Sequence, residues 1–322
     1  MIIDQNSFVL FRLPNQNVIE FWELKENKSD NGKFIFHSFD NTKHLELFAK
    51  AKQFLKLSDL RDIKIHINHN TSGKLPYSLS KKEYLEKAED YIEKLNHQVF
   101  DKIILSRVKI VDGINELSFK FMQLCEKYPN AWIYLFHHNQ ETWLGASPER
   151  LLFSDEKGFK TVALAATKST AENRDWNQKE YKEHNLVVEY ITSKFEEDAI
   201  KKHGPYTIDL GEIQHLKTDI DIVDDSLNLN QVLEKLHPTP AVCGMPKDKT
   251  MKYIIDTEDY DRSYYTGYFG IVTEEHTEFN VNLRCAQLFQ NKSAIYIGGG
   301  LVAESKAESE WNETEMKSRA LL

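Results

Sequence analysis

The chain has 322 residues, and its 41% hydrophobic content can fill one large domain or two small ones. Its 50 acidic residues outnumber its 41 basic residues, and the resulting formal charge of −9 argues against nucleic acid or an anionic membrane as the main partner. The apolar runs are far shorter than a membrane span, and Asp4 replaces the basic start of a signal peptide, so we expect a cytoplasmic protein. Cys125, Cys243 and Cys285 are widely spaced and odd in number, which favours reduced thiols.

Short runs of alternating apolar and polar residues between Ser7 and about His66 predict antiparallel strands. A polar stretch from Asn68 to Ser80 follows and is a candidate soft boundary. We therefore expect a single domain, 1–322, in which residues 1–79 form a strand-rich N-terminal part and residues 80–322 form the motif-bearing core.

A helix and a strand open the second part. Ser80 and Glu83 have the spacing of a capping box, and apolar residues at helical intervals after them predict an amphipathic helix. An apolar strand from Ile103 to Val111 follows, with Lys102 at its start. A lysine at the end of a strand more commonly extends its ammonium into solvent than takes part in a functional site. Both roles are therefore considered for Lys102.

The central region alternates helix and strand. A helix is predicted at Leu117–Lys127, and apolar strands at 132–138 and 161–169. Between the two strands, Ser147 and Pro148 form a turn that leads Glu149 into another strand. A glutamate at such a position is usually an exposed rim residue.

A further helix is expected from Glu172 to Lys194, with Glu180 and Glu183 three residues apart on it. Its expected buried stripe consists of Leu186, Val187, Tyr190 and Ile191. The same E-x-x-E spacing occurs elsewhere in the chain, so the spacing alone is a weak signal.

The next segment contains an acidic run, 219–225, which we interpret as a surface loop. Three prolines then make 236–246 a rigid, extended segment that can place Ala241 against a ligand. In the predicted strand 278–289, Arg284 lies among apolar residues. A buried arginine needs an anionic partner, either a structural carboxylate or a substrate carboxylate.

The last stretch contains strand, glycine and helix signals. Residues 295–297 look like the end of a strand, and 298–300 is a glycine triplet that allows a sharp turn and a close approach of backbone to ligand. Ser305 and Glu308 have capping-box spacing and are expected to start a helix.

Three charged residues of this helix, Glu310, Glu313 and Lys317, can share one face. Two carboxylates and an ammonium so arranged could hold a divalent cation beside an anionic substrate. The alternative is a solvated helix that is stabilised by its own salt bridges.

Six motifs in order along the chain carry a family resemblance. They are DKIILSR, GASPERLLF, ALAATKS, KEYKEHNLVVEYI, LHPTPAVCGMP with DYDRSYYTGYFGIV, and NLRCAQLF with GGGLVAESKAESEWNETEMK. From about Ser80 onward the chain resembles the chorismate-utilising enzymes, and among them the isochorismate synthases. The resemblance implies an α/β fold of the α+β type, similar to anthranilate synthase component I, with large antiparallel sheets wrapped by helices around a central cleft.

The implied reaction adds water to C2 of chorismate and removes the hydroxyl from C4. By motif matching, Lys102 would be the general base and Glu149 the general acid. Lys102 must then be neutral near pH 7 and Glu149 protonated, so burial and a nearby metal must lower the pKa of the lysine, and desolvation must raise the pKa of the glutamate.

The resemblance also implies a Mg²⁺ cofactor. Glu183 and Glu313 would be direct ligands, and Glu180 and Glu310 would hold metal-bound waters. The implied substrate-binding residues are His215, Ala166, Thr167, Ala241, Arg284, Gly298, Gly300 and Lys317. The partner is then a small molecule, chorismate, and we expect a monomer or weak homodimer that serves menaquinone or siderophore biosynthesis.

Individual residues favour this member of the family over its relatives. Ala165 stands where aminodeoxychorismate synthases carry a nucleophilic lysine, which disfavours amination. Ala241 stands where salicylate synthases tend to carry a hydroxyl residue; a salicylate synthase and a non-catalytic chorismate-binding paralogue are the alternatives. Ala166 departs from the glycine of the family's A-G-T turn, and a positive φ there would cost about 1 kcal/mol or more.

Overall fold

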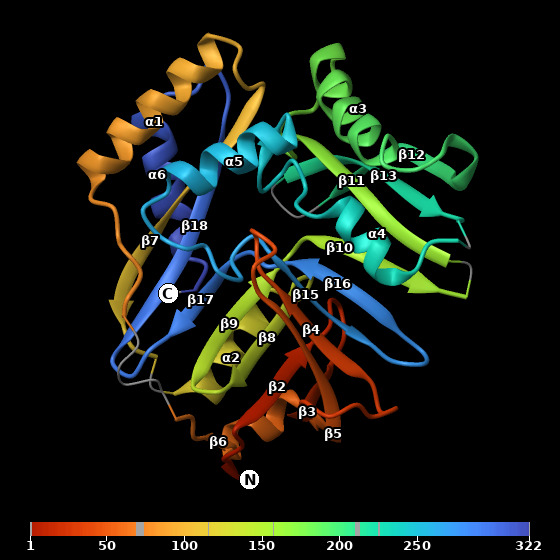
Figure 1. The fold of residues 1–322 in the computed structure, drawn as a ribbon, viewed down its shortest axis with the longest axis vertical. Coiled ribbons are helices and arrows are strands. Elements are labelled where there is room, and N and C mark those ends of the chain that lie inside the picture. The colour runs from red at the N-terminus through yellow and green to blue at the C-terminus, as the bar shows by residue number, and fades with distance from the viewer. Residues whose placement is uncertain are drawn as a thin grey trace. The chain divides into compact units, whose positions relative to one another are not determined.

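The computed structural model describes residues 2–68, 74–114, 116–156, 158–209, 213–224 and 226–321. The chain divides into two compact units, each assembled from separate segments. Unit 1 comprises Met1–Glu149, Pro238–Thr273 and Asn280–Leu322, and unit 2 comprises Arg150–His237 and Glu274–Phe279. Each unit has its own strands and helices (Figure 1).

Unit 1 contains a long antiparallel sheet. Its strands are β2 (Ser7–Arg12), β3 (Val18–Lys25), β4 (Lys33–His37), β5 (His44–Lys56), β7 (Lys102–Asp112), β8 (Trp132–His138), β9 (Glu141–Ser147), β14 (Gly244–Met245), β15 (Tyr268–Val272), β17 (Cys285–Leu288) and β18 (Lys292–Leu301). They are ordered β15-β4-β5-β3-β2-β8-β9-β17-β18-β7-β14, and β1 (Ile2–Ile3) pairs separately with β6 (Lys64–Ile65). The antiparallel strands expected in the N-terminal part are confirmed.

The helices of unit 1 are α1 (Lys81–Asn96), α2 (Leu117–Lys127), α5 (Lys247–Thr257) and α6 (Ala307–Ser318), with a short 3₁₀ turn at Leu57–Asp62. Helix α1 begins where its capping box predicts. The Ser80 side chain accepts a hydrogen bond from the Glu83 amide, and the Glu83 carboxylate accepts one from the Ser80 amide at 2.8 Å. The buried face of α1 then repeats at helical intervals, through Tyr84, Ala88, Tyr91 and Leu95.

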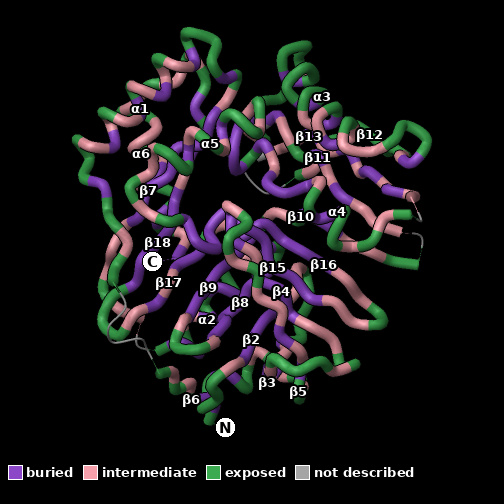
Figure 2. Tube along the Cα trace, viewed as in Figure 1, coloured by how far each residue is buried: buried purple, intermediate pink, exposed green. Residues whose placement is uncertain are grey.

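The two faces of the sheet carry different cores because successive side chains of a strand point to opposite sides. On one side, Ile295 and Ile297 of β18 pack in a mainly aliphatic cluster with Phe121 of α2. On the other side, Tyr296 packs in an aromatic cluster with Trp143 and other buried rings. Figure 2 shows the inner strands β2, β8 and β9 buried along most of their length. Because of this alternation, Ile295 and Ile297 face the aliphatic cluster and Tyr296 faces the aromatic one.

Unit 2 is built on a smaller antiparallel sheet. Its strands are β10 (Arg150–Asp155), β11 (Gly158–Ser169), β12 (Ile200–Asp209), β13 (Ile213–Ile222) and the first residues of β16 (Thr277–Val281), whose last residues belong to unit 1. The order is β12-β13-β11-β10-β16. Its helices are α3 (Gln178–Thr192) and α4 (Leu229–Leu236), with a 3₁₀ turn at Glu197–Ala199.

Two predictions in unit 2 were wrong. Helix α3 begins at Gln178 instead of Glu172, because Asn177 caps it and forms a capping box with Glu180. The acidic run expected to be a loop lies largely in β13, which extends to Ile222; Asp225 is outside the described residues.

The predicted buried stripe of α3 was correct at Ile191, whereas Val187 and Tyr190 are only half-buried. The buried residues are Glu180, His184, Val188 and Ile191, whereas Leu186 is 45% exposed. Two of the four buried side chains are polar, and each has a partner within unit 2: His184 shares a hydrogen bond of 2.7 Å with Thr218, and Glu180 binds Arg174. A pattern based on hydrophobicity alone could not identify this face.

The glycine triplet does not form the expected turn. Strand β18 continues through 298–300 to Leu301, paired with β7 along its whole length. The helix start was also misplaced, because α6 begins at Ala307 after Lys306 and has no side-chain cap. The Ser305 hydroxyl instead donates to Glu310 Oε1 at 2.8 Å.

Candidate active site

Lys102 lies at the start of β7, where the strand pairs with β14 on one side and β18 on the other. Its side chain is half-buried and passes directly over Gly300 of β18. A Cβ atom on Gly300 would lie 2.8 Å from Lys102 Cε and 3.5 Å from Nζ. A glycine is therefore needed in the strand to let the lysine side chain cross it at this distance.

Glu149 follows β9 immediately after the turn at Ser147 and Pro148. Its backbone is held by the Val281 amide, which donates to the Glu149 carbonyl at 3.0 Å. Burial raises the pKa of the Glu149 carboxyl to about 7, although the positive charge of Lys102 lowers it in part. Unit 1 therefore brings the predicted acid and base within electrostatic range of each other.

Thr239 is a third residue at this position and was not predicted from the sequence. Its Oγ1 is buried, and no described residue gives it a hydrogen bond of good geometry, but it lies close enough to the Glu149 carboxyl to lower its pKa. A hydroxyl residue between two prolines, in PTP, is the local signal that could have identified it.

The three glycines of β18 face alternate sides of the strand. Gly298 and Gly300 face Tyr265 and Lys102, whereas Gly299 faces α6. A Cβ atom on Gly299 would lie 3.3 Å from Glu310 Oε2 and 3.9 Å from Glu313 Oε1. The absence of a side chain at 299 thus allows two carboxylates of α6 to approach the same point on the strand.

Glu310, Glu313 and Lys317 share one face of α6, as the sequence predicted. Lys317 Nζ lies 2.6 Å from Glu313 Oε1 and donates to the Gly298 carbonyl at 3.2 Å. The ammonium and the two carboxylates therefore all adjoin the glycine segment of β18.

Helix α6 is attached to the sheet by Arg107 of β7. Its guanidinium donates to Thr314 Oγ1 at 2.8 Å, forms an ion pair with Glu315 and lies 4.0 Å from the centre of the Trp311 ring. This arginine is 2% exposed, so it is a fixed attachment point for the helix that carries the carboxylates.

In unit 2, Ala166 and His215 lie together on neighbouring strands. Ala166 has a φ of 61° at a β-bulge between Ala165 and Thr167, and its carbonyl lies 3.2 Å from His215 Nδ1. Ala166 therefore takes the positive φ that would be cost-free only for the glycine of the family's turn. Thr167 pairs with His215 in the ladder, but its side chain is outside the described atoms.

The two glutamates of α3 have different surroundings. Glu180 is buried, and its two carboxylate oxygens accept hydrogen bonds of 2.8 and 2.7 Å from Arg174. The hydrogen bonds from Arg174, with further help from the Asn177 amide, lower the Glu180 pKa to about 2. Glu183 is exposed one turn further along. Glu180 therefore already stabilises the start of the helix, and its part in a metal site stays a prediction.

One other predicted residue, Arg284, lies differently from expectation. Arg284 was expected to be buried but is exposed, because the predicted strand is interrupted between β16 and β17 and Arg284 takes a φ of 47° there. Its guanidinium lies 5.5 Å from the centre of the Tyr128 ring, where a cation–π contact supplies the partner. Ala241 is exposed in the turn that follows Pro240.

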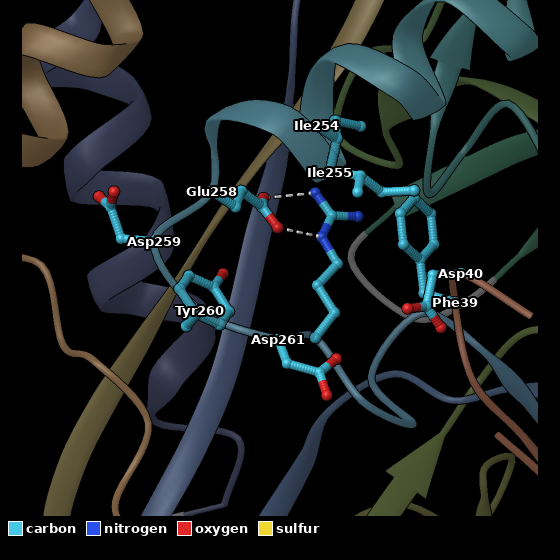
Figure 3. Close-up of a pocket in the computed structure, with 9 residues that line it drawn as sticks. Phe39, Asp40, Ile254, Ile255, Glu258, Asp259, Tyr260 and Asp261 are labelled. Carbon is cyan, nitrogen blue, oxygen red and sulfur yellow. Dashed lines mark hydrogen bonds and ion pairs between the residues drawn. The ribbon is translucent and has the colours of Figure 1, made fainter. Parts of the chain in front are cut away.

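A cavity of about 410 Å³ in unit 1 lies near the end of α5 (Figure 3). Its lining consists of Phe39, Asp40, Ile254, Ile255, Glu258, Asp259, Tyr260, Asp261 and Arg262. None of these residues was predicted to be in the site. The segment DYDRSYYTGYFGIV supported the family resemblance, but no role was predicted for any of its residues.

The family model described as "Chorismate binding enzyme" matches residues 15–322. The chain belongs to this family. Curated relatives of this chorismate-binding chain include isochorismate synthase MenF of Escherichia coli strain K12, 30% identical over 69% of this chain and 55% of the relative. The vibriobactin-specific isochorismate synthase of Vibrio cholerae is 28% identical over 99% of this chain and 85% of the relative. The chain thus spans about half the length of its Escherichia coli relative.

Solved structures confirm the predicted fold of this family member. The menaquinone-specific isochorismate synthase MenF from Escherichia coli superposes with a TM-score of 0.81 at 20% identity, covering 99% of this chain and 88% of that one. Anthranilate synthase component I from Streptococcus pneumoniae superposes with a TM-score of 0.76 at 15% identity, covering 99% and 91%. Within the described ranges, every helix is too short or too polar to span a bilayer.

Proposed function

We propose that this chain is an isochorismate synthase, which converts chorismate to isochorismate. The observation that carries the proposal is the electrostatic interaction of Lys102 with Glu149, a half-buried residue whose carboxyl pKa is raised to about 7. The names of the Escherichia coli and Vibrio cholerae relatives support the same activity.

In the proposed reaction, neutral Lys102 removes a proton from the water that attacks C2. The allylic double bond moves, and the hydroxyl at C4 leaves as water with the proton of Glu149. One water enters and one leaves, so the mass of the substrate does not change. Transfer of a proton from Lys102 to Glu149, directly or through water, restores the starting state. A carboxyl pKa of about 7 suits this acid, because the best general acid has a pKa near the pH at which it works.

Chorismate carries two carboxylates, so its site needs local positive charge in a chain of net charge −9. Lys317, beside the glycine segment of β18, is the proposed cation in unit 1. The amides of Gly298 and Gly300 are proposed to assist it. His215, Ala166, Thr167, Ala241 and Arg284 remain proposed substrate contacts on the resemblance alone.

The proposed cofactor is Mg²⁺, bound directly by Glu183 and Glu313 and through water by Glu180 and Glu310. In unit 1 the donors fit such a cation: two carboxylates adjoin Gly299, and Mg²⁺ prefers carboxylate and water oxygens. Among the described residues, no group of three or more His, Cys, Asp or Glu side chains is placed to hold a metal ion, so the full ligand set is a proposal. When bound, the cation would supply positive charge beside a substrate carboxylate.

Water is the proposed nucleophile, since Lys102 stands at the position for activating it. Ala165 excludes a covalent lysine intermediate at that position, and the small, exposed Ala241 favours release of isochorismate without loss of pyruvate. The chain is proposed to act as a monomer or weak homodimer in the cytoplasm.

Chromatography with mass detection tests the proposal. The purified chain is incubated with chorismate and Mg²⁺, beside Lys102→Ala, Glu149→Gln and a chelator control. Lys292→Ala is the matched control, because this exposed lysine at the far end of β18 forms an ion pair with Asp112, away from Lys102. We expect an isomer of chorismate from the parent chain and Lys292→Ala, and a loss of about 10²-fold or more in the two site variants.

Each other outcome contradicts a defined part of the proposal. Salicylate with pyruvate would show that Ala241 does not prevent elimination, and unchanged chorismate would show a binding protein without catalysis. Calorimetric titration of Mg²⁺ into the parent chain and Glu313→Gln tests the metal separately, because weaker binding is expected in the variant whether or not it turns over substrate.

A further inference from the structure

Glu258 and Arg262 form a deeply buried ion pair just after α5. Their side chains are 4% and 3% exposed. Arg262 donates to both carboxylate oxygens of Glu258, from Nη2 to Oε1 at 2.6 Å and from Nε to Oε2 at 2.7 Å, and Figure 3 shows these two bonds. Removing two charges from water costs free energy unless further hydrogen bonds offset it, so the remaining contacts of the pair indicate what it does.

The other N–H groups of Arg262 bind two carbonyls that are distant in sequence. Nη1 donates to the Val242 carbonyl at 3.0 Å, and Nη2 donates to the Ile104 carbonyl at 3.0 Å. Val242 directly follows Ala241, and Ile104 is two residues beyond the proposed base, Lys102. One rigid guanidinium therefore joins the two segments that carry proposed site residues.

These two segments also pair with each other. The Ile104 amide donates to the Cys243 carbonyl at 3.0 Å, and in the β14–β7 ladder Met245 pairs with Lys102. The Val242 amide in turn donates to the Thr239 carbonyl at 3.1 Å. Arg262 thus binds both the strand that begins at Lys102 and the turn that contains Thr239, so it helps to set the distance between these two residues. Thr239 in turn lies next to Glu149.

Glu258 is itself tied to β7. The Ser106 hydroxyl donates to Glu258 Oε1 at 2.6 Å and shares a hydrogen bond of 2.5 Å with the Tyr260 hydroxyl. The Ser106 hydroxyl therefore helps to fix the orientation of the carboxylate, and the guanidinium bound to it has little freedom to turn.

We infer that Glu258 and Arg262 are positioning residues, which hold the strand of Lys102 against the Thr239–Val242 turn at the separation that proton transfer requires. The inference rests on the proposed function for its chemistry. Neither residue is proposed to touch chorismate. A displacement of about 1 Å at a reacting group can cost about 10²-fold in rate, which sets the expected effect.

Arg262→Lys is the informative variant. It keeps a positive charge beside Glu258 but loses the planar fork that reaches both carbonyls at once. Lys87→Gln is the matched control: Lys87 binds the Thr257 carbonyl at 2.6 Å and Asp259 at 3.1 Å at the same end of α5. The measurements are kcat and KM for chorismate, the pH profile of kcat and the melting temperature, and the parent chain is assayed first.

We expect Arg262→Lys to lower kcat by about 10²-fold with KM changed by less than about threefold, and to move the limb of the pH profile that Glu149 sets. Lys87→Gln should match the parent chain. If the parent chain makes no isochorismate, the proposed function fails. The positioning role fails if the parent chain is active and the folded Arg262→Lys variant has the kcat and pH profile of the parent chain. It also fails if the variant differs from the parent chain only by a higher KM.

A second variant covers the case in which Arg262→Lys does not fold. Glu258→Gln combined with Arg262→Met removes both charges from the interior, which buried ion pairs often tolerate. The same fall in kcat with unchanged KM is expected, and a kcat equal to that of the parent chain would overturn the inference.

Discussion

The positive charge of Lys102 and the carboxyl of Glu149 are coupled within unit 1: burial raises the pKa of Glu149 to about 7, and Lys102 opposes part of that rise. Such opposed effects on a pKa are common where groups exchange protons. The interaction between the two side chains can therefore be measured through the pKa of Glu149, without an assay of turnover.

Replacing Lys102 by methionine should therefore raise the pKa of Glu149 further above 7, because the favourable interaction with its ionised form is lost while the burial remains. The pKa can be followed by NMR of the chain with ¹³C-labelled glutamate carboxyls. Lys292→Met, on the exposed end of β18, should leave it unchanged. A pKa that stays the same or falls in Lys102→Met would show that the two side chains do not interact.

The raised pKa of Glu149 also predicts how stability depends on pH. Between about pH 4.5 and 7 the native carboxyl keeps a proton that the unfolded chain releases, so the free energy of unfolding decreases as pH rises through this range. Each pH unit corresponds to about 1.4 kcal/mol. The free energy of unfolding of Glu149→Gln does not have this decrease. Urea unfolding should therefore show the variant becoming more stable relative to the parent chain from pH 4.5 to pH 8. A constant difference would contradict the prediction, and exposed Glu156→Gln is the control.

Ala166→Gly should stabilise the chain by about 1 kcal/mol, since only a residue without Cβ adopts a φ of 61° at no steric cost. Urea unfolding of the two proteins measures this difference. Ala163→Gly, in the same strand and fully buried, should destabilise the chain. Equal losses at both positions would mean that Ala166 is not strained.

Gly299→Ala and Gly300→Ala should produce different defects although the residues are adjacent. A Cβ at 300 displaces the flexible end of Lys102, so kcat should fall by about 10-fold or more with Mg²⁺ dependence unchanged. A Cβ at 299 approaches Glu310 and Glu313 instead, so the Mg²⁺ concentration for half-maximal rate should rise. Identical kinetic defects in the two variants would show that the faces of β18 are not separated as described.

Local spacing accounts for the parts of the fold that were predicted correctly. The capping box at Ser80 and Glu83 acts across three residues, and the apolar–polar alternation between Ser7 and about His66 acts across two, so neither depends on distant segments. The shared face of Glu310, Glu313 and Lys317 follows from helical periodicity in the same way. Motif order along the chain was sufficient to identify the family.

Tertiary contacts decided the features that local spacing could not. Leu186 is exposed while His184 is buried, because the face of α3 against the sheet offers Thr218 as a hydrogen-bond partner. Arg284 is exposed because a break between strands turns it toward Tyr128. Both outcomes depend on what lies opposite each side chain.

The sequence by itself determined the family, most helix and strand positions and the candidate acid and base. Only the tertiary structure placed Lys102 near Glu149, made the glycines part of a strand, and joined Val242 to Ile104 through Arg262. The physical reason is that burial and charge coupling depend on distances between segments far apart in the chain, and the spacing of residues along the chain does not specify those distances.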